Sequence, residues 1–103
     1  MIRAGLIGYG KAGKVFHAPL IASVDDLELK AIARSNDVEK VIDDDAIDLV
    51  VIATPNASHF DVARRALGRG KHVVVDKPFT VTADEARQLI ALARERSRVL
   101  SVF

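Results

Sequence analysis

Apolar segments alternate with helical patterns from one end of the chain to the other. Short runs that are apolar throughout, or that alternate apolar and polar residues, predict strands at residues 2–7, 27–33, 49–53, 72–75 and 99–103. Apolar residues at three- and four-residue spacing predict helices at residues 11–24, 58–69 and 82–96. This alternation predicts an α/β fold with a doubly wound parallel sheet of about five strands.

Three local signals refine the helix boundaries. Pro19 falls inside the first predicted helix, where its missing N–H predicts a kink. Gly70 follows the second helix, at a position that favours a residue with positive φ. Thr82 and Glu85 have the spacing of a capping box, in which each side chain bonds a backbone N–H at a helix start.

The segment from residue 35 to residue 48 has the weakest periodicity and is rich in acidic residues. We interpret Asp43, Asp44, Asp45 and Asp48 as a solvated turn and the start of a helix. A metal cluster is the alternative, but consecutive aspartates point in different directions, which does not favour a shared cation. No metal site is therefore predicted.

The composition narrows the function classes. A length of 103 residues suits one domain, and a formal net charge of +1 gives no electrostatic case for nucleic acid or an anionic membrane as partner. The chain contains no cysteine, so disulfides and thiolate metal ligands are excluded. No apolar run reaches the roughly 18–20 residues of a membrane span, and no secretory signal pattern follows Met1. By elimination, we expect a cytoplasmic protein.

A glycine motif, G-x-G-x-x-G, connects the first predicted strand to the first predicted helix. In that context Gly8 allows a tight turn, Gly10 lets the backbone approach a pyrophosphate, and Gly13 lets the helix pack against the strand. The helix start then offers N–H groups and a partial positive charge to the phosphates. The motif predicts a Rossmann-like domain that binds a dinucleotide; a glycine-rich turn without a ligand is the alternative. The predicted contacts are Gly8, Tyr9, Gly10, Lys11, Ala12 and Gly13.

The residues after the second strand bear on the choice between NAD and NADP. NAD-binding domains usually place an acidic residue there for the ribose 2′-hydroxyl, but this strand is followed by Arg34, Ser35 and Asn36. A guanidinium suits a 2′-phosphate through paired, charge-assisted hydrogen bonds. We therefore predict contacts from Arg34 and Ser35 and a preference for NADP over NAD. The alternative is that Arg34 is a surface cation and that Asp37, or no residue, meets the ribose.

Several motifs together resemble a known family. The glycine motif is followed by His17-Ala18-Pro19, Ala53-Thr54-Pro55-Asn56-Ala57-Ser58-His59, Gly70-Lys71-His72-Val73 and Asp76-Lys77-Pro78. In this combination, over nearly the whole chain, they resemble the cofactor-binding half of the Gfo/Idh/MocA oxidoreductases. The resemblance implies hydride transfer between nicotinamide and a hydroxyl or carbonyl group of a sugar, inositol or polyol-like substrate. Two alternatives are a non-catalytic NAD(P)-binding or redox-sensing module and an interaction domain whose glycine loop is empty.

The resemblance also implies roles for individual residues. In such enzymes an E-K-P motif places a lysine beside the nicotinamide and the substrate, and Asp76, Lys77 and Pro78 match it with Asp in place of Glu. Lys77 would be the catalytic residue that orients a substrate hydroxyl and assists proton transfer; a surface lysine at a strand end is the alternative. Asp76 and Pro78 would face the cofactor with it.

The same family reading places further residues beside the cofactor, namely Thr54, Pro55, Asn56 and His59. Asn56 is equally suited to cap the next helix, and His59 to be a helix-surface histidine. His17 lies near the nicotinamide by analogy, or is a half-buried helix residue.

Two departures from the family pattern matter. Family members usually have a further helix and strand after the second strand, so we expect a sheet shortened there; residues 35–47 still meet the ~10–12 residues that a parallel crossover needs. Family enzymes also continue into a C-terminal domain that supplies substrate contacts and usually the oligomer interface. We therefore expect residues 1–103 to be the dinucleotide-binding domain of a longer, homo-oligomeric enzyme.

Overall fold

The computed structural model describes residues 1–8, 10 and 17–103 of the chain. The described strands are β1 (Ile2–Ile7), β2 (Leu27–Ala33), β3 (Leu49–Ile52), β4 (His72–Val75) and β5 (Leu100–Val102). The described helices are α1 (Ala18–Ser23), α2 (Glu39–Ile42), α3 (His59–Gly68) and α4 (Ala83–Arg96), with a short 3-10 helix, η2 (Asn56–Ser58), before α3.

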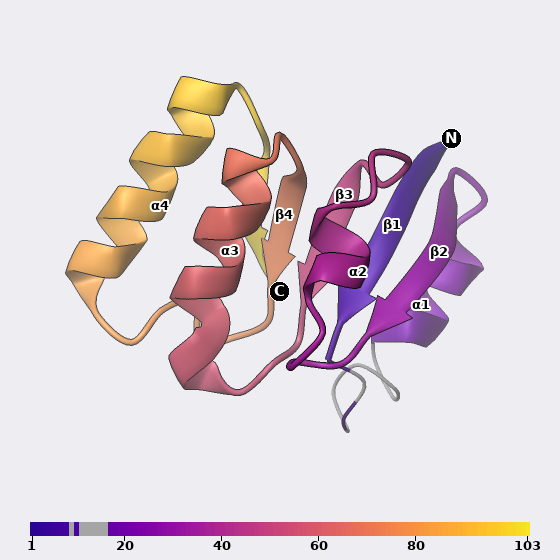
Figure 1. The fold of residues 1–103 in the computed structure, drawn as a ribbon, viewed down its shortest axis with the longest axis horizontal. Coiled ribbons are helices and arrows are strands. Elements are labelled where there is room, and N and C mark those ends of the chain that lie inside the picture. Colours follow the sequence, from indigo (N-terminus) through magenta and orange to yellow (C-terminus); the bar gives the residue numbers. More distant parts are fainter. Residues whose placement is uncertain (9, 11–16) are drawn as a thin grey trace.

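The described strands form one parallel sheet in the order β2-β1-β3-β4-β5. This is the doubly wound order 3-2-1-4-5-6 without its outermost strand. The predicted shortening after the second strand is therefore confirmed, because the chain crosses from β2 directly to β3 through α2. The crossover leaves β2 at the edge of the sheet (Figure 1).

Helices cover both faces of the sheet. On one face Ala4, Leu6 and Val51 pack against Ala18 and Ile21 of α1. On the other face, buried residues of β1, β3 and β4 pack against α2, α3 and α4, which lie together on that side in Figure 1. Successive residues of a strand point to opposite faces, so near-continuous apolar runs such as that of β3 are what a sheet buried on both sides requires.

Most predicted boundaries are confirmed. The strands β1, β2 and β4 have the predicted bounds, whereas β3 ends one residue early and β5 covers only the centre of its predicted range. The predictions for 58–69 and 82–96 correspond to α3 and α4. Pro19 occupies the first turn of α1, where a missing N–H is tolerated. Residues 11–16 of the predicted helix lie outside the described residues, so the predicted kink stays a prediction. Within the described ranges, none of the helices combines the length and apolarity needed to cross a membrane.

The predicted helix ends are also found, with one difference. Gly70 has φ of +80°, as expected for the residue after α3. The Thr82 hydroxyl accepts the N–H of Glu85 at 3.2 Å, which is half of the predicted capping box. The Glu85 carboxylate accepts the N–H of Val81 at 3.2 Å instead of that of Thr82. The glutamate thus ties down the residue before the N-cap of α4.

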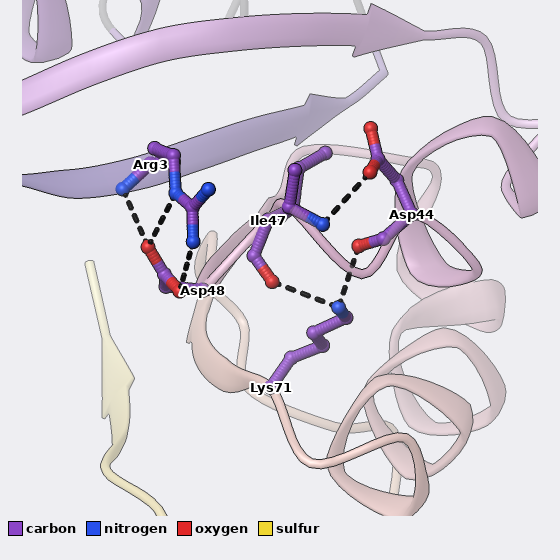
Figure 2. A network of polar contacts seen from close by, with 6 residues as sticks. Arg3, Asp44, Ile47, Asp48 and Lys71 are labelled. Carbon is purple, nitrogen blue, oxygen red and sulfur yellow. Dashed lines mark hydrogen bonds and ion pairs between the residues drawn. The ribbon is translucent and has the colours of Figure 1, made fainter.

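The acidic segment before β3 is more ordered than a solvated turn. Asp48 accepts the backbone N–H of Arg3 at 2.9 Å and the Arg3 guanidinium at 3.2 and 3.3 Å, which joins the start of β1 to the start of β3 (Figure 2). The hydrogen bond from the Arg3 side chain, and to a smaller extent that from the Arg3 backbone N–H, holds the pKa of the Asp48 carboxyl below its ordinary value. Asp44 accepts the N–H of Ala46 at 2.9 Å. Asp44 and Asp48 are therefore hydrogen-bonded residues of a turn that is still partly exposed. The predicted helix start is wrong, because α2 ends at Ile42, before these acids.

Lys71 completes this polar network from the other side. Its side chain is buried, and Nζ donates to the carbonyl oxygens of Asp44 at 2.7 Å and Ile47 at 2.8 Å (Figure 2). A buried ammonium is tolerated only where acceptors replace its water. Lys71 therefore stabilises the turn before β3, at the edge where β3 and β4 begin. Within residues 1–8, 10 and 17–103, no three metal-binding side chains gather at one point.

Candidate functional site

The candidate site lies where the parallel strands end. Backbone hydrogen bonds continue the ladder one residue past the strands: Gly8 N–H bonds to Ala33 O, and Ala53 N–H bonds to Ile7 O, each at 2.8 Å. The Asp76 N–H bonds to Ile52 O at the same distance. The residues just beyond β1, β3 and β4 are thus held in line along the edge to which the arrowheads point (Figure 1). In open α/β sheets, ligands bind at this edge.

An open cavity of about 590 Å³ occupies this edge. The described residues that line it come from the loops after four strands, and they are Gly8, Gly10, Arg34, Ser35, Ala53, Thr54, Pro55 and Asp76. All of them except Ala53 were predicted to contact the cofactor. The structure brings these residues together because every strand of the sheet runs in the same direction.

Gly8 is required by the geometry of this edge. Its φ is +95°, and a Cβ atom built on it would lie 2.5 Å from the carbonyl oxygen of Ala53. Any other residue would therefore be strained and would also collide with the end of β3. By contrast, a Cβ built on Gly10 meets no described atom within 4 Å. No described atom thus crowds Gly10, which is compatible with the prediction of a close-approaching pyrophosphate.

Four predicted cofactor contacts lie outside the described residues. They are Tyr9, Lys11, Ala12 and Gly13. The described part of the site therefore consists of Gly8, Gly10 and the loops after β2, β3 and β4.

The loop after β2 brings a cation to the cavity. Arg34 and Ser35 are exposed and line it. Asp37, the first acid after β2, forms an ion pair with Lys40, with 2.9 Å between Lys40 Nζ and Asp37 Oδ2. Asp37 is also absent from the lining residues. The charge that this loop offers to a ligand is therefore positive, which fits a phosphate.

The loop after β3 forms one wall of the cavity. Thr54 is buried, and the Ser58 hydroxyl lies 2.7 Å from both Thr54 Oγ1 and Pro55 O. These contacts fix the turn that leads into η2. Asn56 is exposed and is the first residue of η2, while Ser58 holds the N-cap position of α3 without a side-chain cap bond. The prediction that Asn56 caps the next helix is therefore wrong.

The loop after β4 brings a carboxylate and a buried histidine together. Asp76 lines the cavity, and its Oδ1 lies 3.5 Å from Nε2 of His17. The His17 ring is only 3% exposed and packs edge-on against Phe103, with 4.6 Å between ring centroids. Its Nε2 has no hydrogen-bond partner among the described residues. His17 is therefore buried rather than half-buried, and its ring lies beside the Asp76 carboxylate.

Lys77 and Pro78 follow Asp76 directly and are exposed. The Lys77–Pro78 peptide bond is cis. Neither residue is among the described residues that line the cavity. Lys77 is thus adjacent in the chain to Asp76, whose carboxylate is among the described groups that line the cavity.

His59 occupies a position that differs from a helix-surface histidine. It is the first residue of α3, it is 1% exposed, and its two ring nitrogens contact the carbonyl oxygens of Thr54 and Pro78. The alternative of a surface histidine is therefore wrong. Periodicity alone gave no signal for this contact, because its two partners are backbone atoms of separate loops.

The residues of the cavity fit a dinucleotide. A glycine turn provides backbone that can approach a phosphate closely, and Arg34 adds a guanidinium on the side of β2. Asp76 and the adjacent Lys77 follow β4, whereas Arg34 follows β2. The strands β1 and β3 therefore separate the Arg34 guanidinium from the candidate reactive groups. An extended ligand with a charged end and a reactive end matches this arrangement.

Comparisons with known proteins agree with this geometry. Residues 33–103 match the family model GFO_IDH_MocA, an oxidoreductase family with an NAD-binding Rossmann fold. The chain is 52% identical to the uncharacterized oxidoreductase YdgJ of Escherichia coli (strain K12), covering 99% of this chain and 34% of that protein. It is 34% identical to scyllo-inositol 2-dehydrogenase (NADP(+)) IolW of Bacillus subtilis (strain 168), over 99% of this chain and 33% of the relative.

A solved structure from Klebsiella pneumoniae has a TM-score of 0.94 at 49% identity, over 100% of this chain and 34% of its own. The chain thus spans about a third of the length of these relatives. The alignment with YdgJ extends over 117 residues, more than the 103 of this chain, so the relative has additional residues within the matched region. Because the family model matches well over half of its residues, the chain belongs to the Gfo/Idh/MocA oxidoreductase family.

Proposed function

We propose that this chain is the cofactor-binding part of an NADP-dependent dehydrogenase that acts on a hydroxyl or carbonyl group of an inositol, sugar or related polyol. The observation that carries the proposal is the cavity at the carboxyl edge of the sheet, which Gly8, Arg34 and Asp76 line together. The nicotinamide cofactor, when bound, supplies the hydride chemistry. The residues of this chain bind, orient and exchange a proton with the reactants.

Support for the substrate class comes from the name of one relative. IolW, which is 34% identical to this chain, is a scyllo-inositol 2-dehydrogenase that uses NADP(+). A site for a hydroxyl-rich substrate needs hydrogen-bond donors and acceptors that pair with the substrate hydroxyls. Such a site rejects analogues that lack those hydroxyls. Asp76, which lines the cavity, and the exposed Lys77 that follows it are such groups.

Lys77 is the residue to which we assign proton exchange with the substrate. A lysine ammonium beside a substrate hydroxyl can hold its oxygen and stabilise negative charge as the proton leaves. The position of Lys77 supports this role: the residue is exposed and directly follows Asp76, which lines the cavity. The side chain is thus accessible to a substrate that approaches from above the sheet edge.

Arg34 is the residue to which we assign the preference for NADP. It lines the cavity after β2, and the nearest following acid, Asp37, is engaged by Lys40. A 2′-phosphate would gain a charged partner there, whereas a 2′-hydroxyl would find no carboxylate among the lining residues of this loop.

We also propose that the protein has a second domain that completes the substrate site. The relatives are about three times as long as this chain. The sheet face that bears α1 exposes large apolar side chains, among them Leu20, Val24 and Phe103, at 51, 45 and 51%. A contiguous exposed apolar surface of this kind is typical of a face that another part of a protein covers.

Turnover by the full-length protein tests the proposal. The protein is incubated with NADP⁺ or NAD⁺ and a panel of inositols, sugars and polyols, and reduction of the cofactor is followed at the nicotinamide absorbance. We expect turnover with at least one polyol and a higher kcat/KM with NADP⁺. Tight NADPH binding without turnover on any substrate would instead favour a redox-sensing module. No binding of either cofactor would overturn the assignment of the cavity.

The substitution Lys77→Met separates catalysis from binding. We expect kcat to fall by roughly 100-fold or more, as for loss of a general acid–base group, while the Kd of NADPH stays within about threefold. Lys30→Met is the matched control, because Lys30 is an exposed residue of β2. Equal activity of the Lys77→Met and Lys30→Met variants would remove Lys77 from the reaction.

A further inference from the structure

Both ring nitrogens of His59 contact a backbone carbonyl oxygen. Nδ1 lies 2.7 Å from Pro78 O, and Nε2 lies 2.8 Å from Thr54 O. The side chain is 1% exposed, so solvent does not share these contacts. His59 is therefore enclosed between two loops, with one acceptor on each side of its ring.

This arrangement bears on how many protons the ring carries. A carbonyl oxygen only accepts hydrogen bonds, and a neutral imidazole has one N–H and one lone pair. A neutral ring would therefore point a lone pair at a carbonyl oxygen less than 3 Å away. An imidazolium has two N–H donors and satisfies both oxygens.

Two effects oppose the charged form of the ring. His59 is the first residue of α3, where the helix dipole disfavours a cation. Burial also disfavours the charged form. Two short hydrogen bonds from a charged donor are stronger than neutral ones, and both carbonyl groups would lose their partner if the ring turned away.

The two loops that His59 joins form the cavity. Thr54 lines it at the end of β3, and Pro78 directly follows Lys77 at the end of β4. We propose that His59 is a positioning residue which, as an imidazolium, holds the loop of Lys77 at a fixed distance from the cavity wall. It acts through backbone atoms and touches neither cofactor nor substrate. Only its effect on catalysis rests on the function proposed above.

The charged groups around His59 are few. Residues 53–58 contain no titratable side chain, and the loop after β4 contributes Asp76 and Lys77. Asp76 faces His17, whose Nε2 is 3.5 Å from its Oδ1, so a second histidine lies near the site. The other charged groups on α3 and on the first turn of the adjacent α4 are Asp61, Arg64, Arg65, Asp84 and Glu85.

The protonation state is measured directly by nitrogen NMR of the full-length protein labelled with ¹⁵N-histidine. The signals of His59 are assigned by their loss in the His59→Gln variant. We expect two protonated ring nitrogens at neutral pH, with the similar shifts of an imidazolium. One protonated and one unprotonated nitrogen would overturn the proposal. This result does not depend on the substrate or on turnover, so it stands even where the proposed function fails.

The positioning role is tested by the kinetics of His59→Gln. The single amide nitrogen of Gln cannot donate to both carbonyl oxygens, because they face different ring nitrogens of His59. We expect kcat to fall by roughly 10- to 100-fold through misplacement of Lys77, while KM for NADP⁺ changes by less than about threefold. Wild-type kcat should also decline as rising pH removes the second ring proton, and this decline should be absent in His59→Gln.

His72→Gln is the matched control. His72 lies at the opposite edge of the sheet, and its Nδ1 accepts the N–H of Val99 at 2.9 Å. This variant should keep both the wild-type kcat and the decline at high pH. A decline that persists unchanged in His59→Gln would assign it to another group, such as His17, and would overturn the positioning role.

Discussion

The carbonyl oxygen of Ala53 lies 2.5 Å from the place that a Cβ atom on Gly8 would occupy. The end of β1 and the end of β3 therefore approach each other as closely as backbone allows. Gly8 and Ala53, which make this approach, both line the cavity. The two glycines of the motif, Gly8 and Gly10, therefore have different physical roles. Gly8 is required by the fold, whereas a Cβ atom on Gly10 would meet no described atom within 4 Å.

The first prediction compares alanine at these two glycines. Gly8→Ala should destabilise the protein by roughly 2–4 kcal/mol, because the residue has positive φ and the new methyl group meets backbone that cannot yield. Gly10→Ala should change stability by less than about 0.5 kcal/mol but weaken NADPH binding by roughly tenfold or more, through loss of the close approach. Thermal unfolding and NADPH fluorescence titration measure the two effects. A Gly10→Ala protein that binds NADPH as the wild type does would contradict the placement of the phosphates.

The second prediction concerns cofactor preference. Arg34→Ala should weaken NADPH binding by roughly 10- to 100-fold, the value of one or two hydrogen bonds to a charged group, and leave NADH binding within about twofold. Arg64→Ala is the control, since Arg64 is exposed on α3 and pairs with Asp61. Dissociation constants for both cofactors, measured with all three proteins, check this. Equal losses for NADPH and NADH would mean that Arg34 does not read the 2′-phosphate.

Much of the fold and of the cavity follows from local patterns. The strands are short, and buried strands are recognised by continuous apolar runs bounded by turns. Once they are taken as parallel, their carboxyl ends must share one edge. That rule alone brings Arg34, Thr54 and Asp76 together, and the cavity confirms it.

The contacts that the sequence did not predict join residues far apart in the chain. The bonds between Arg3 and Asp48 span 45 positions, and neither residue has a spacing that indicates the other. His17 and Asp76 meet only because α1 begins, and β4 ends, near the same edge. For His59, the partners are carbonyl oxygens, which every residue possesses. Periodicity reports which face of an element is buried, and it contains no information on such pairs.

The third prediction is a dependence of stability on pH. The hydrogen bonds from Arg3 lower the pKa of the Asp48 carboxyl, so the ionised form stabilises the folded chain. This contribution is complete above the ordinary aspartate pKa of about 3.9 and is lost as pH falls through the lower pKa of the folded state. Asp48→Asn should therefore lower the melting temperature at pH 7, and the difference from the wild type should shrink in acid.

Asp45→Asn is the control for this comparison. The Asp45 side chain is fully exposed, and its oxygen lies 3.8 Å from the Arg69 guanidinium. Such a surface ion pair contributes little to stability, so this variant should melt like the wild type at every pH. A constant difference between wild type and Asp48→Asn from neutral to strongly acidic pH would show that the carboxylate charge is not the cause.

The fourth prediction concerns Lys71, which belongs to the family motifs as Lys77 does but lies at the other edge of the sheet. Lys71 is 5% exposed and donates to two carbonyl oxygens at the edge where β3 and β4 begin, opposite to the cavity. Lys71→Met removes both donors and leaves two buried acceptors unsatisfied, which should cost about 2–4 kcal/mol of unfolding free energy. NADPH affinity of the folded fraction should stay within about twofold, since no cavity residue is touched. Lys30→Met, at an exposed position of β2, controls for loss of a lysine. If Lys71→Met instead reduced cofactor affinity without a loss of stability, Lys71 would belong to the site and not to the framework that supports it.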